Sequence, residues 1–293
     1  MHQINLPELW IESFPVYDET THKYKRGQVF VLGGVEMTGA ACLSADAAAR
    51  VGAGLVTIIS PYLSAFQKLI RFDPIGVYKS FKPYIMVKQQ HLLNAVQKSQ
   101  EKGRCSVIIG PGLGNREYST VRSIVYSILE EKTLLVLDAD GLNAFEGRQA
   151  QLYTLLHEDS VVTPHEGEFK KLFPELSLDS HEDRIQSTQL AAKKCGCVIV
   201  LKGARTIIAN EHSYVINTNA KPSLATAGSG DVLSGIIAGL MAQGMDAFDA
   251  ARCGVWIHGK TSQTSEPCLV ATDINEKIPL VLKEMLGIDK KLG

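Results

Sequence analysis

Short, continuously apolar runs recur along this chain, and none shows the polar alternation of a strand that faces water on one side. We predict strands at 29–32, 55–59, 106–109, 134–137, 160–163 and 198–201. Such runs are typical of strands covered on both faces, as in a parallel sheet. Helical patterns lie between them at 38–51, 117–130, 182–194 and 232–241, and another follows at 247–262. This alternation predicts an α/β fold, with a mostly parallel central sheet and helices on both faces.

A hairpin is expected next to the last of these strands. Residues 205–209 and 213–216 flank the turn-like tripeptide Asn210-Glu211-His212, which predicts an antiparallel pair and therefore a mixed sheet. The sequence contains no repeat at a fixed period and no linker rich in Pro, Gly and Ser. At 293 residues, a single α/β domain spanning 1–293 is the simplest organisation.

Composition excludes several classes of protein. The formal net charge is -1, which argues against a nucleic-acid partner or a membrane-surface role. No apolar stretch reaches the roughly 18 residues that a membrane-spanning helix needs. The segment Met1 to Pro7 lacks the pattern of a secretory signal. We therefore expect a soluble, cytoplasmic protein.

The six cysteines give no sign of a disulfide framework or a metal site. They are scattered, mostly within apolar runs, which predicts reduced and buried thiols. The close pair Cys195 and Cys197 lacks the spacing and the second ligand pair of a zinc site. No metal ligand set is assigned from the sequence.

Several predicted strands end in glycine or polar residues just before a helix. These segments are Gly33-Gly34, Gly110-Pro111-Gly112-Leu113-Gly114, Asp138-Ala139-Asp140-Gly141 and Thr163-Pro164-His165-Glu166. Ligands of open α/β sheets bind outside the carboxyl ends of the strands. We expect the four segments to gather at one sheet edge and form the binding site.

The strongest local signal is the turn Ala227-Gly228-Ser229-Gly230-Asp231, which opens an apolar helix. Glycines let phosphate oxygens approach the backbone, and the first turn of a helix offers free N–H donors. The turn therefore predicts an anion site that binds an adenine nucleotide. An aspartate beside a phosphate suggests a base that accepts a hydroxyl proton, although helix N-capping is an alternative role for Asp231.

Two other strand ends carry charged or titratable groups. Pro164 ends a strand and leaves His165 in a loop, where ligand contact is favoured, while Glu166 and Glu168 suit the start of the next helix. Asp138 and Asp140 close a strand two residues apart, on the same side of an extended segment, and such a pair could hold Mg²⁺ through water or bind a hydroxyl, but on these residues alone the structural alternative is preferred. A turn with an N-capping aspartate is the structural alternative.

The segment Lys202-Gly203-Ala204-Arg205-Thr206 places two cations on a glycine turn after a strand. These charges would neutralise phosphates, or they would simply be solvated, as most charged turns are. Neither the G-x-G-x-x-G dinucleotide pattern nor the P-loop pattern occurs in the sequence. Any nucleotide site must therefore be built in another way.

In their order along the chain, these segments resemble the ADP/ATP-dependent NAD(P)H-hydrate dehydratases, a branch of the ribokinase-like superfamily. The resemblance runs through most of the chain and also includes His22-Lys23, Thr38-Gly39-Ala40-Ala41 and the segment Val51 to Thr57. It implies a ribokinase-like three-layer sandwich. It further implies a lyase that uses ADP or ATP, with Mg²⁺, to dehydrate the S form of hydrated NADH or NADPH, releasing phosphate and restoring the reduced cofactor.

The resemblance also assigns roles to residues. Asp231 is implied to be the base toward the substrate hydroxyl, and Gly228, Ser229 and Gly230 to hold the transferred phosphate. The hydrated nicotinamide nucleotide is implied to contact Ala40, Gly112, Gly114, His165 and Asp231. The adenine nucleotide is implied to contact Lys202, Gly203, Ala204, Arg205 and Thr206 together with Gly230. Ser229 stands where relatives often carry threonine.

Many members of this family carry an N-terminal epimerase domain, and the first predicted strand lies too close to Met1 to leave room for one. This predicts a separate hydrate epimerase as a possible partner. We also expect a homo-oligomer, although the apolar helices at 232–241 and 247–262 suit burial within the fold as well as a subunit contact.

A small-molecule kinase of the same superfamily, acting on a thiazole or pyrimidine alcohol, is the alternative enzyme. A nucleotide sensor without turnover is the alternative from another class.

Overall fold

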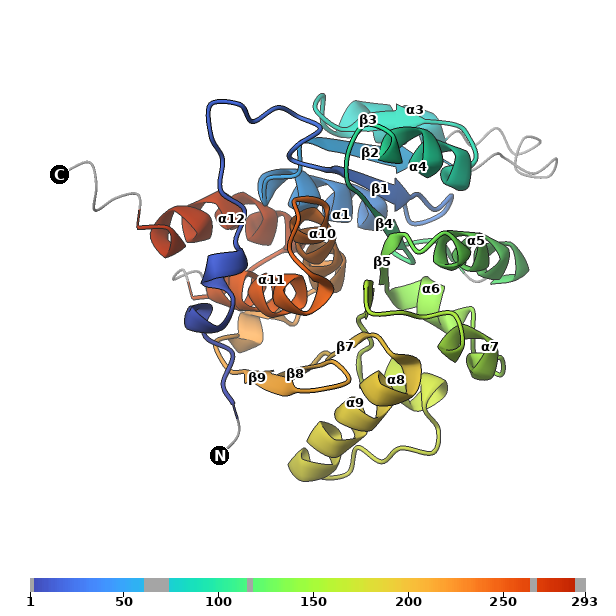
Figure 1. Ribbon diagram of the computed structural model, residues 1–293, viewed down its shortest axis with the longest axis vertical. Helices are drawn as coiled ribbons and strands as arrows, with labels where there is room; N and C mark the ends of the chain where they lie inside the picture. Colours follow the sequence, from blue (N-terminus) through green and yellow to red (C-terminus); the bar gives the residue numbers. More distant parts are fainter. Residues whose placement is uncertain (1–2, 61–73, 115–117, 264–267, 288–293) are drawn as a thin grey trace.

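The computed structural model describes residues 3–60, 74–114, 118–263 and 268–287 as a nine-stranded sheet between two layers of helices (Figure 1). The strand order is β3-β2-β1-β4-β5-β6-β7-β8-β9. Every pair from β3 to β7 is parallel, whereas β8 pairs antiparallel with both β7 and β9. The strands are β1 (Gln28–Leu32), β2 (Leu55–Ile59), β3 (Met86–Lys88), β4 (Cys105–Ile109), β5 (Leu134–Leu137), β6 (Ser160–Val162), β7 (Val198–Leu201), β8 (Thr206–Ala209) and β9 (Tyr214–Asn217).

The six strands predicted from apolar runs and the predicted hairpin are confirmed, with boundaries that differ by at most one residue. The mixed sheet is confirmed as well. Strand β3 was not predicted. It has three residues, lies at the edge of the sheet and contains no fully buried side chain, so it lacks the continuous apolar run that marks the others.

The helices cover both faces of the sheet. They are α1 (Thr38–Arg50), α3 (Pro74–Phe81), α4 (Leu92–Gln100), α5 (Tyr118–Glu130), α6 (Ala139–Asn143), α7 (Gln149–Tyr153), α8 (Glu166–Leu172), α9 (His181–Cys195), α10 (Ser229–Ala242), α11 (Ala247–Thr261) and α12 (Ala271–Met285), with short 3-10 turns at Pro7–Leu9, Ile11–Ser13 and Pro222–Leu224. The predicted helices are confirmed as α1, α5, α9, α10 and α11, although residue 117 lies outside the described ranges. Helix α12 was not predicted, and it contains Pro279, which usually breaks a helical pattern.

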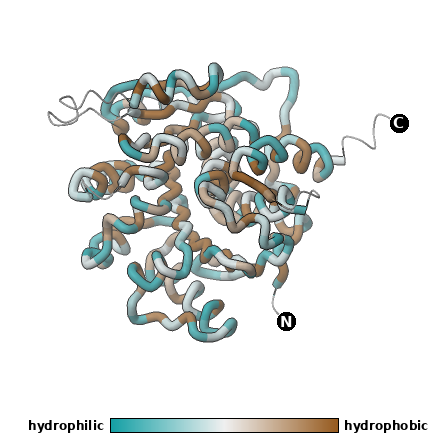
Figure 2. The backbone as a smooth tube through the Cα atoms, turned by 180° about the vertical axis from the view of Figure 1, so that it is seen from behind, coloured by the Kyte–Doolittle hydropathy of each residue, from teal (hydrophilic) through white to brown (hydrophobic). Residues whose placement is uncertain are grey.

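Alternate residues of each strand face two separate hydrophobic cores. In β1, Val29 and Val31 pack toward α1, α10, α11 and α12, whereas Phe30 and Leu32 pack toward the layer that includes α4 and α5. Figure 2 shows the hydrophobic residues concentrated along the strands and the inner helices, with hydrophilic residues along the outer ones. The sheet is therefore buried on both sides, as its apolar runs require. Within the described ranges, no helix is both long and apolar enough to cross a membrane.

Helix α10 runs through one core, and close packing against α1 fixes its position. A Cβ on Gly235 would lie only 2.2 Å from the Ser44 carbonyl oxygen, so no larger residue fits there. The Ser44 hydroxyl donates to the Asp231 carbonyl oxygen at 2.9 Å. This contact holds the start of α10 against α1, at the carboxyl edge of the parallel strands.

The strand ends gather at that edge, as predicted. The Asp138 N–H donates to the Ile109 carbonyl, which joins the ends of β5 and β4. The Lys202 N–H donates to the Pro164 carbonyl at 2.9 Å, which joins the ends of β7 and β6. All six cysteines lie among the described residues, and all except Cys268 are buried, as expected of cysteines in apolar runs.

Candidate active site

The glycine-rich turn begins α10 in a conformation that exposes backbone donors. Gly228 is the N-cap with a φ of 85°, in the left-handed region that favours glycine. Asp231 is therefore the third helical residue, and the alternative that it caps the helix is wrong. Within the described residues, the N–H groups of Gly230 and Asp231 donate no hydrogen bond. Two free donors at a helix N-terminus form a site for an anion.

The Asp231 carboxylate lies on the α1 side of this helix start. One of its oxygens is 3.8 Å from the position of a Cβ on Gly228, beside Leu43 of α1. Among the described residues, this side chain makes no hydrogen bond or ion pair. Burial raises the pKa of Asp231 to about 7, the negative charge of Asp138 adds to the rise, and the Lys202 ammonium opposes it. A carboxylate with a pKa near neutrality and no structural partner is suited to accept a proton.

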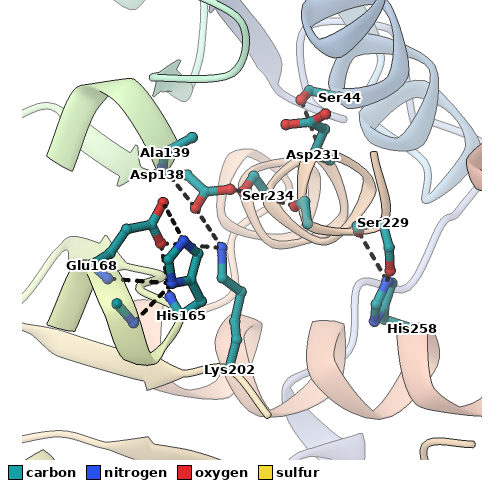
Figure 3. Close-up of polar contacts among 12 residues, drawn as sticks. Ser44, Asp138, Ala139, His165, Glu168, Lys202, Ser229, Asp231, Ser234 and His258 are labelled. Carbon is teal, nitrogen blue, oxygen red and sulfur yellow. Dashed lines mark hydrogen bonds and ion pairs between the residues drawn. The ribbon is translucent and has the colours of Figure 1, made fainter. Parts of the chain in front are cut away.

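Lys202 is held by two buried carboxylates rather than by solvent. Its Nζ lies 2.8 Å from Asp138 Oδ1 and 3.8 Å from Glu168 Oε2 (Figure 3). Ser234 of α10 donates to the other Asp138 oxygen at 2.7 Å. A Cβ on Gly230 would lie 3.4 Å from the ammonium, so the charge is next to the glycine turn. The alternative that Lys202 is merely solvated is wrong.

The alternative that Asp138 and Asp140 act as a pair is also wrong. Asp138 is extended and caps α6, accepting the Ala139 N–H at 2.9 Å, which confirms the structural alternative. Asp140 belongs to the helix and accepts the Gly114 N–H at 2.8 Å. The helix starts between the two residues, so their side chains take different directions and serve different partners.

His165 combines a structural role with a place at the site. It caps α8, where Nδ1 accepts the N–H groups of Gly167 and Glu168 at 3.0 and 3.2 Å. Glu168 completes the capping box by accepting the His165 N–H at 2.8 Å. The imidazole is 61% exposed, which agrees with its predicted loop position. Glu166 and Glu168 start the next helix, as the sequence indicates.

A cavity of about 660 Å³ opens on the other side of α10 from Asp231. This volume is in the range of small-molecule sites. Apolar side chains, including Leu224, Leu233 and Val255, form part of its wall, and Lys202, Asn217 and His258 add polar groups. Seven of the residues assigned by resemblance line this cavity: His165, Lys202, Gly203, Ala204, Thr206, Ser229 and Gly230.

His258 of α11 was missed by the sequence reasoning. Its Nε2 lies 3.0 Å from both the hydroxyl and the carbonyl oxygen of Ser229, at the first residue of α10. Burial lowers the pKa of His258 to about 4, so the imidazole is neutral at neutral pH. Its sequence signal is a single histidine in a largely apolar helix, and that pattern more often marks a structural residue.

The remaining predicted residues lie outside this cavity. Arg205 borders a neighbouring hollow, and Gly228 faces Leu43 and Ala271. A Cβ on Gly112 would lie 3.0 Å from the Ala40 Cβ, so Ala40 and Gly112 are in contact. Gly114 is tied to Asp140, whose negative charge also acts on Asp231. Asp231 therefore has the nucleotide-sized cavity on one side of its helix and the segments of Ala40 and Gly112 on the other.

Comparison with known proteins agrees with this geometry. The family model for NAD(P)H-hydrate dehydratase matches residues 29–279. The bifunctional NAD(P)H-hydrate repair enzyme Nnr of Coxiella burnetii is 34% identical over 275 residues, covering 90% of this chain and 53% of that protein. The chain thus spans about half the length of the curated relatives that it matches.

Solved structures give the same fold. A ribokinase-like superfamily protein of Enterococcus faecalis has a TM-score of 0.79 and 25% identity, with 96% of this chain and 95% of that chain covered. The ADP/ATP-dependent NAD(P)H-hydrate dehydratase of Bacillus subtilis, co-crystallised with ATP and Mg²⁺, has a TM-score of 0.78 and 24% identity, with 97% and 99% covered. The fold is ribokinase-like, and the chain belongs to the NAD(P)H-hydrate dehydratase family.

Proposed function

We propose that this chain dehydrates the S form of hydrated NADH and NADPH, using ADP or ATP, and thereby repairs damaged cofactor. The observation that carries the proposal is the position of Asp231. Its carboxylate is partly buried, without a partner among the described residues, at a helix start with free N–H donors, between a nucleotide-sized cavity and the segments of Ala40 and Gly112. The proposal treats residues 1–293 as one domain, which the continuous nine-stranded sheet supports.

The proposed reaction begins with phosphorylation of the ring hydroxyl. Asp231 accepts the hydroxyl proton while the oxygen attacks the terminal phosphorus of the nucleotide, which leaves as AMP from ADP or as ADP from ATP. Phosphate is a far better leaving group than hydroxide. The nitrogen lone pair of the ring expels it, and loss of a ring proton restores NADH or NADPH. Each turnover therefore consumes one phosphoanhydride bond and releases one phosphate.

The nucleotide side of the site supplies positive charge and backbone donors. The adenine nucleotide occupies the cavity lined by Lys202, Gly203, Ala204 and Thr206, and Arg205 extends the same segment. The turn of Gly228, Ser229 and Gly230 holds the phosphate being transferred, which the free N–H groups of Gly230 and Asp231 bind, and the Lys202 ammonium balances its charge. His258 holds Ser229 and so fixes the first turn of α10.

The substrate side is formed by small residues. Ala40 and Gly112 are in contact, and the Gly114 N–H donates to Asp140. Because Ala40 and the two glycines have no large side chain, a flat ring can approach the backbone closely. His165 is exposed at the rim of the nucleotide cavity, where its imidazole can contact the dinucleotide. In the proposed complex the ring hydroxyl lies at Asp231.

Mg²⁺ fits this site as a partner of the nucleotide phosphates. Among the described residues, no group of three or more His, Cys, Asp or Glu side chains forms a metal cage. Mg²⁺ commonly binds through one or two carboxylates together with substrate phosphates and water. Asp138 is occupied by Lys202 and Ser234, whereas Asp140 uses one oxygen for the Gly114 N–H and forms no hydrogen bond or ion pair through the other with the described residues, so Asp140 would hold the ion. When bound, the ion neutralises phosphate charge.

Two features of the assembly belong to the same proposal. Only the S hydrate is dehydrated, so full repair requires an epimerase activity that converts the R form, and a separate hydrate epimerase is the expected partner. We also propose a homo-oligomer. Helix α12 supports this, because the apolar side chain of Leu280 is 60% exposed there and a subunit contact would bury it.

The direct test is to incubate the protein with hydrated NADH, Mg²⁺ and either ADP or ATP in parallel. We expect the absorbance of NADH to return, with one phosphate released for each NADH formed. A stable phosphorylated product without recovery of NADH would instead identify a small-molecule kinase. Nucleotide binding without turnover of hydrated NADH or NADPH would identify a sensor, and either result contradicts the proposal.

A further inference from the structure

Tyr78 of α3 is a fully buried tyrosine without a role in the proposed reaction. It is 0% exposed and belongs to the core that contains α1 and α10. Its hydroxyl donates to the Gly34 carbonyl oxygen at 2.5 Å. Burial raises the pKa of Tyr78 above its usual range, so the hydroxyl keeps its proton and remains a donor. Helix α3 therefore makes a directed contact with one of the glycine segments at the carboxyl edge of the sheet.

The Gly33-Gly34 turn fits closely around this hydroxyl. A Cβ on Gly33 would lie 2.8 Å from Tyr78 Oη, so a larger residue cannot occupy this position without displacing the tyrosine. The Gly33 N–H donates to the Ile59 carbonyl oxygen at 2.9 Å, which joins the ends of β1 and β2. The turn is therefore fixed by β2 through Gly33 and by Tyr78 through Gly34.

The same turn packs directly on the segment of Gly112. A Cβ on Gly34 would lie 1.7 Å from the Gly112 carbonyl oxygen, so the two backbones are in contact. Gly112 has a φ of 67°, in the left-handed region, and a Cβ there would lie 2.2 Å from the Met37 carbonyl oxygen and 3.0 Å from the Ala40 Cβ. Contacts therefore run from the Tyr78 hydroxyl through Gly34 and Gly112 to Ala40. Because no flexible side chain lies between them, a shift of the Gly33-Gly34 turn is passed on to Gly112.

Gly112 and Ala40 belong to the substrate side of the proposed site. We propose that Tyr78 is a positioning residue for the substrate, because it holds Gly34 against Gly112 and so sets the shape of the surface that receives the hydrated nicotinamide ring. The identity of this substrate rests on the proposed function. Without the hydroxyl, the Gly34 carbonyl loses its donor and the glycine segments are free to move away from the ring. Tyr78, Gly34 and Gly112 do not line the nucleotide cavity, so the adenine nucleotide should not be affected.

The test is Tyr78→Phe, which removes the hydroxyl and keeps the ring. We expect KM for hydrated NADH to rise about tenfold, a typical cost of a buried group left without its hydrogen bond, while KM for ADP stays unchanged. The value of kcat should change less than KM, because Asp231 and the glycine turn of α10 are not part of this set of contacts. Tyr153→Phe is the matched control. The Tyr153 hydroxyl donates to the Leu172 carbonyl oxygen in the core on the opposite face of the sheet, so the same kind of hydrogen bond is lost away from the substrate side.

The two variants separate a positioning role from a merely structural one. Both should lose stability, which thermal unfolding measures, but only Tyr78→Phe should change one KM and not the other. Unchanged KM values in Tyr78→Phe, or an equal rise in both, would overturn the proposal. The same selective rise in Tyr153→Phe would overturn it too.

Calorimetry with NADH and ADP repeats the comparison without turnover. Binding of NADH should weaken about tenfold in Tyr78→Phe, and binding of ADP should not change. A wild-type protein that binds NADH but does not dehydrate hydrated NADH contradicts only the proposed function. A wild-type protein that binds no NADH overturns the role of Tyr78 as well, because that role requires a dinucleotide at Gly112.

Discussion

Two aspartates lie at the same edge of the sheet, and their surroundings give them opposite properties. Asp138 is 1% exposed and is fully engaged, by the Ala139 N–H, the Lys202 ammonium and the Ser234 hydroxyl. Asp231 is partly buried and has no side-chain partner among the described residues. Burial and the nearby charge of Asp138 raise the pKa of Asp231 to about 7.

This difference gives the two aspartates different roles. The partners of Asp138 all favour its fixed position, so it serves to keep Lys202 beside the glycine turn. Asp231 has no such contact to lose when it takes up a proton, and its negative charge is unfavourable where it stands. The same chemical group therefore acts as a positioning residue in one place and as a base in the other.

The largest expected effect is on catalysis by Asp231→Asn. Loss of a general base lowers kcat by about 10²- to 10⁴-fold, whereas the affinity for ADP changes little, because the backbone donors and Lys202 remain. Steady-state kinetics and calorimetry measure the two quantities. Asp273→Asn is the matched control, since Asp273 is also a third helical residue, in α12, and should leave kcat unchanged. Full turnover by Asp231→Asn would mean that the base lies elsewhere.

Next in size is the loss of stability in Asp138→Asn. This substitution removes the closest counter-charge of Lys202, whose side chain is only 20% exposed. Leaving a largely buried ammonium without its partner costs about 3 kcal/mol in the free energy of unfolding. Urea denaturation at neutral pH measures this loss. An unchanged midpoint would show that Glu168, at 3.8 Å, suffices to hold Lys202.

Asp231→Asn should change stability in the opposite direction. A carboxyl whose pKa is raised on folding destabilises the folded protein when ionised, so the penalty is absent below its ordinary pKa of 3.8 and complete above about 7. The variant should therefore be more stable than wild type at pH 8, by about 2 kcal/mol once solvent screening is allowed for. The gain should shrink as the pH falls from about 7 to about 4. Urea denaturation curves across this pH range measure the free energies of unfolding of both proteins. A difference between them that does not change with pH would contradict the raised pKa of Asp231.

The smallest effect is expected for Ser234→Ala. This change removes one hydrogen bond to Asp138 but leaves the ion pair with Lys202 intact, and a buried hydrogen bond contributes about 1 kcal/mol. Thermal unfolding of the variant measures the cost. Ser127→Ala provides a control, because among the described residues the Ser127 hydroxyl bonds to the Ser123 carbonyl alone, at an exposed position of α5. Equal shifts of Tm in the two variants would show that the hydrogen bond from Ser234 to Asp138 stabilises the fold no more than an exposed serine hydrogen bond does.

Much of the fold was predictable because the sheet is buried on both faces. Strands β5 and β7 consist only of apolar residues, and no helix in the described part of the chain has that pattern. Helix α12 escaped prediction because Pro279 interrupts it and tertiary packing against α1 and α11 compensates. Such packing cannot be recognised from the local sequence.

The site was predictable to a smaller degree. Glycines, Asp231 and Lys202 stand out as residue types at strand and helix ends. The contact between Lys202 and Asp138 joins residues 64 positions apart, and spacing along the chain does not tell which side chains meet across a sheet edge. For the same reason the apparent Asp138 and Asp140 pair was misleading, and His258 was not noticed.

The central claim is that an ionised Asp231 takes the proton from the substrate, and the pH dependence of kcat/KM tests it most directly. For wild type, with hydrated NADH and saturating ADP and Mg²⁺, kcat/KM should rise with pH, pass its half-maximum near the Asp231 pKa of about 7 and then level off. In Asp138→Asn the rise should move to lower pH, because a like charge has been removed. A wild-type profile that is flat from about pH 5 to about pH 9 would contradict the account.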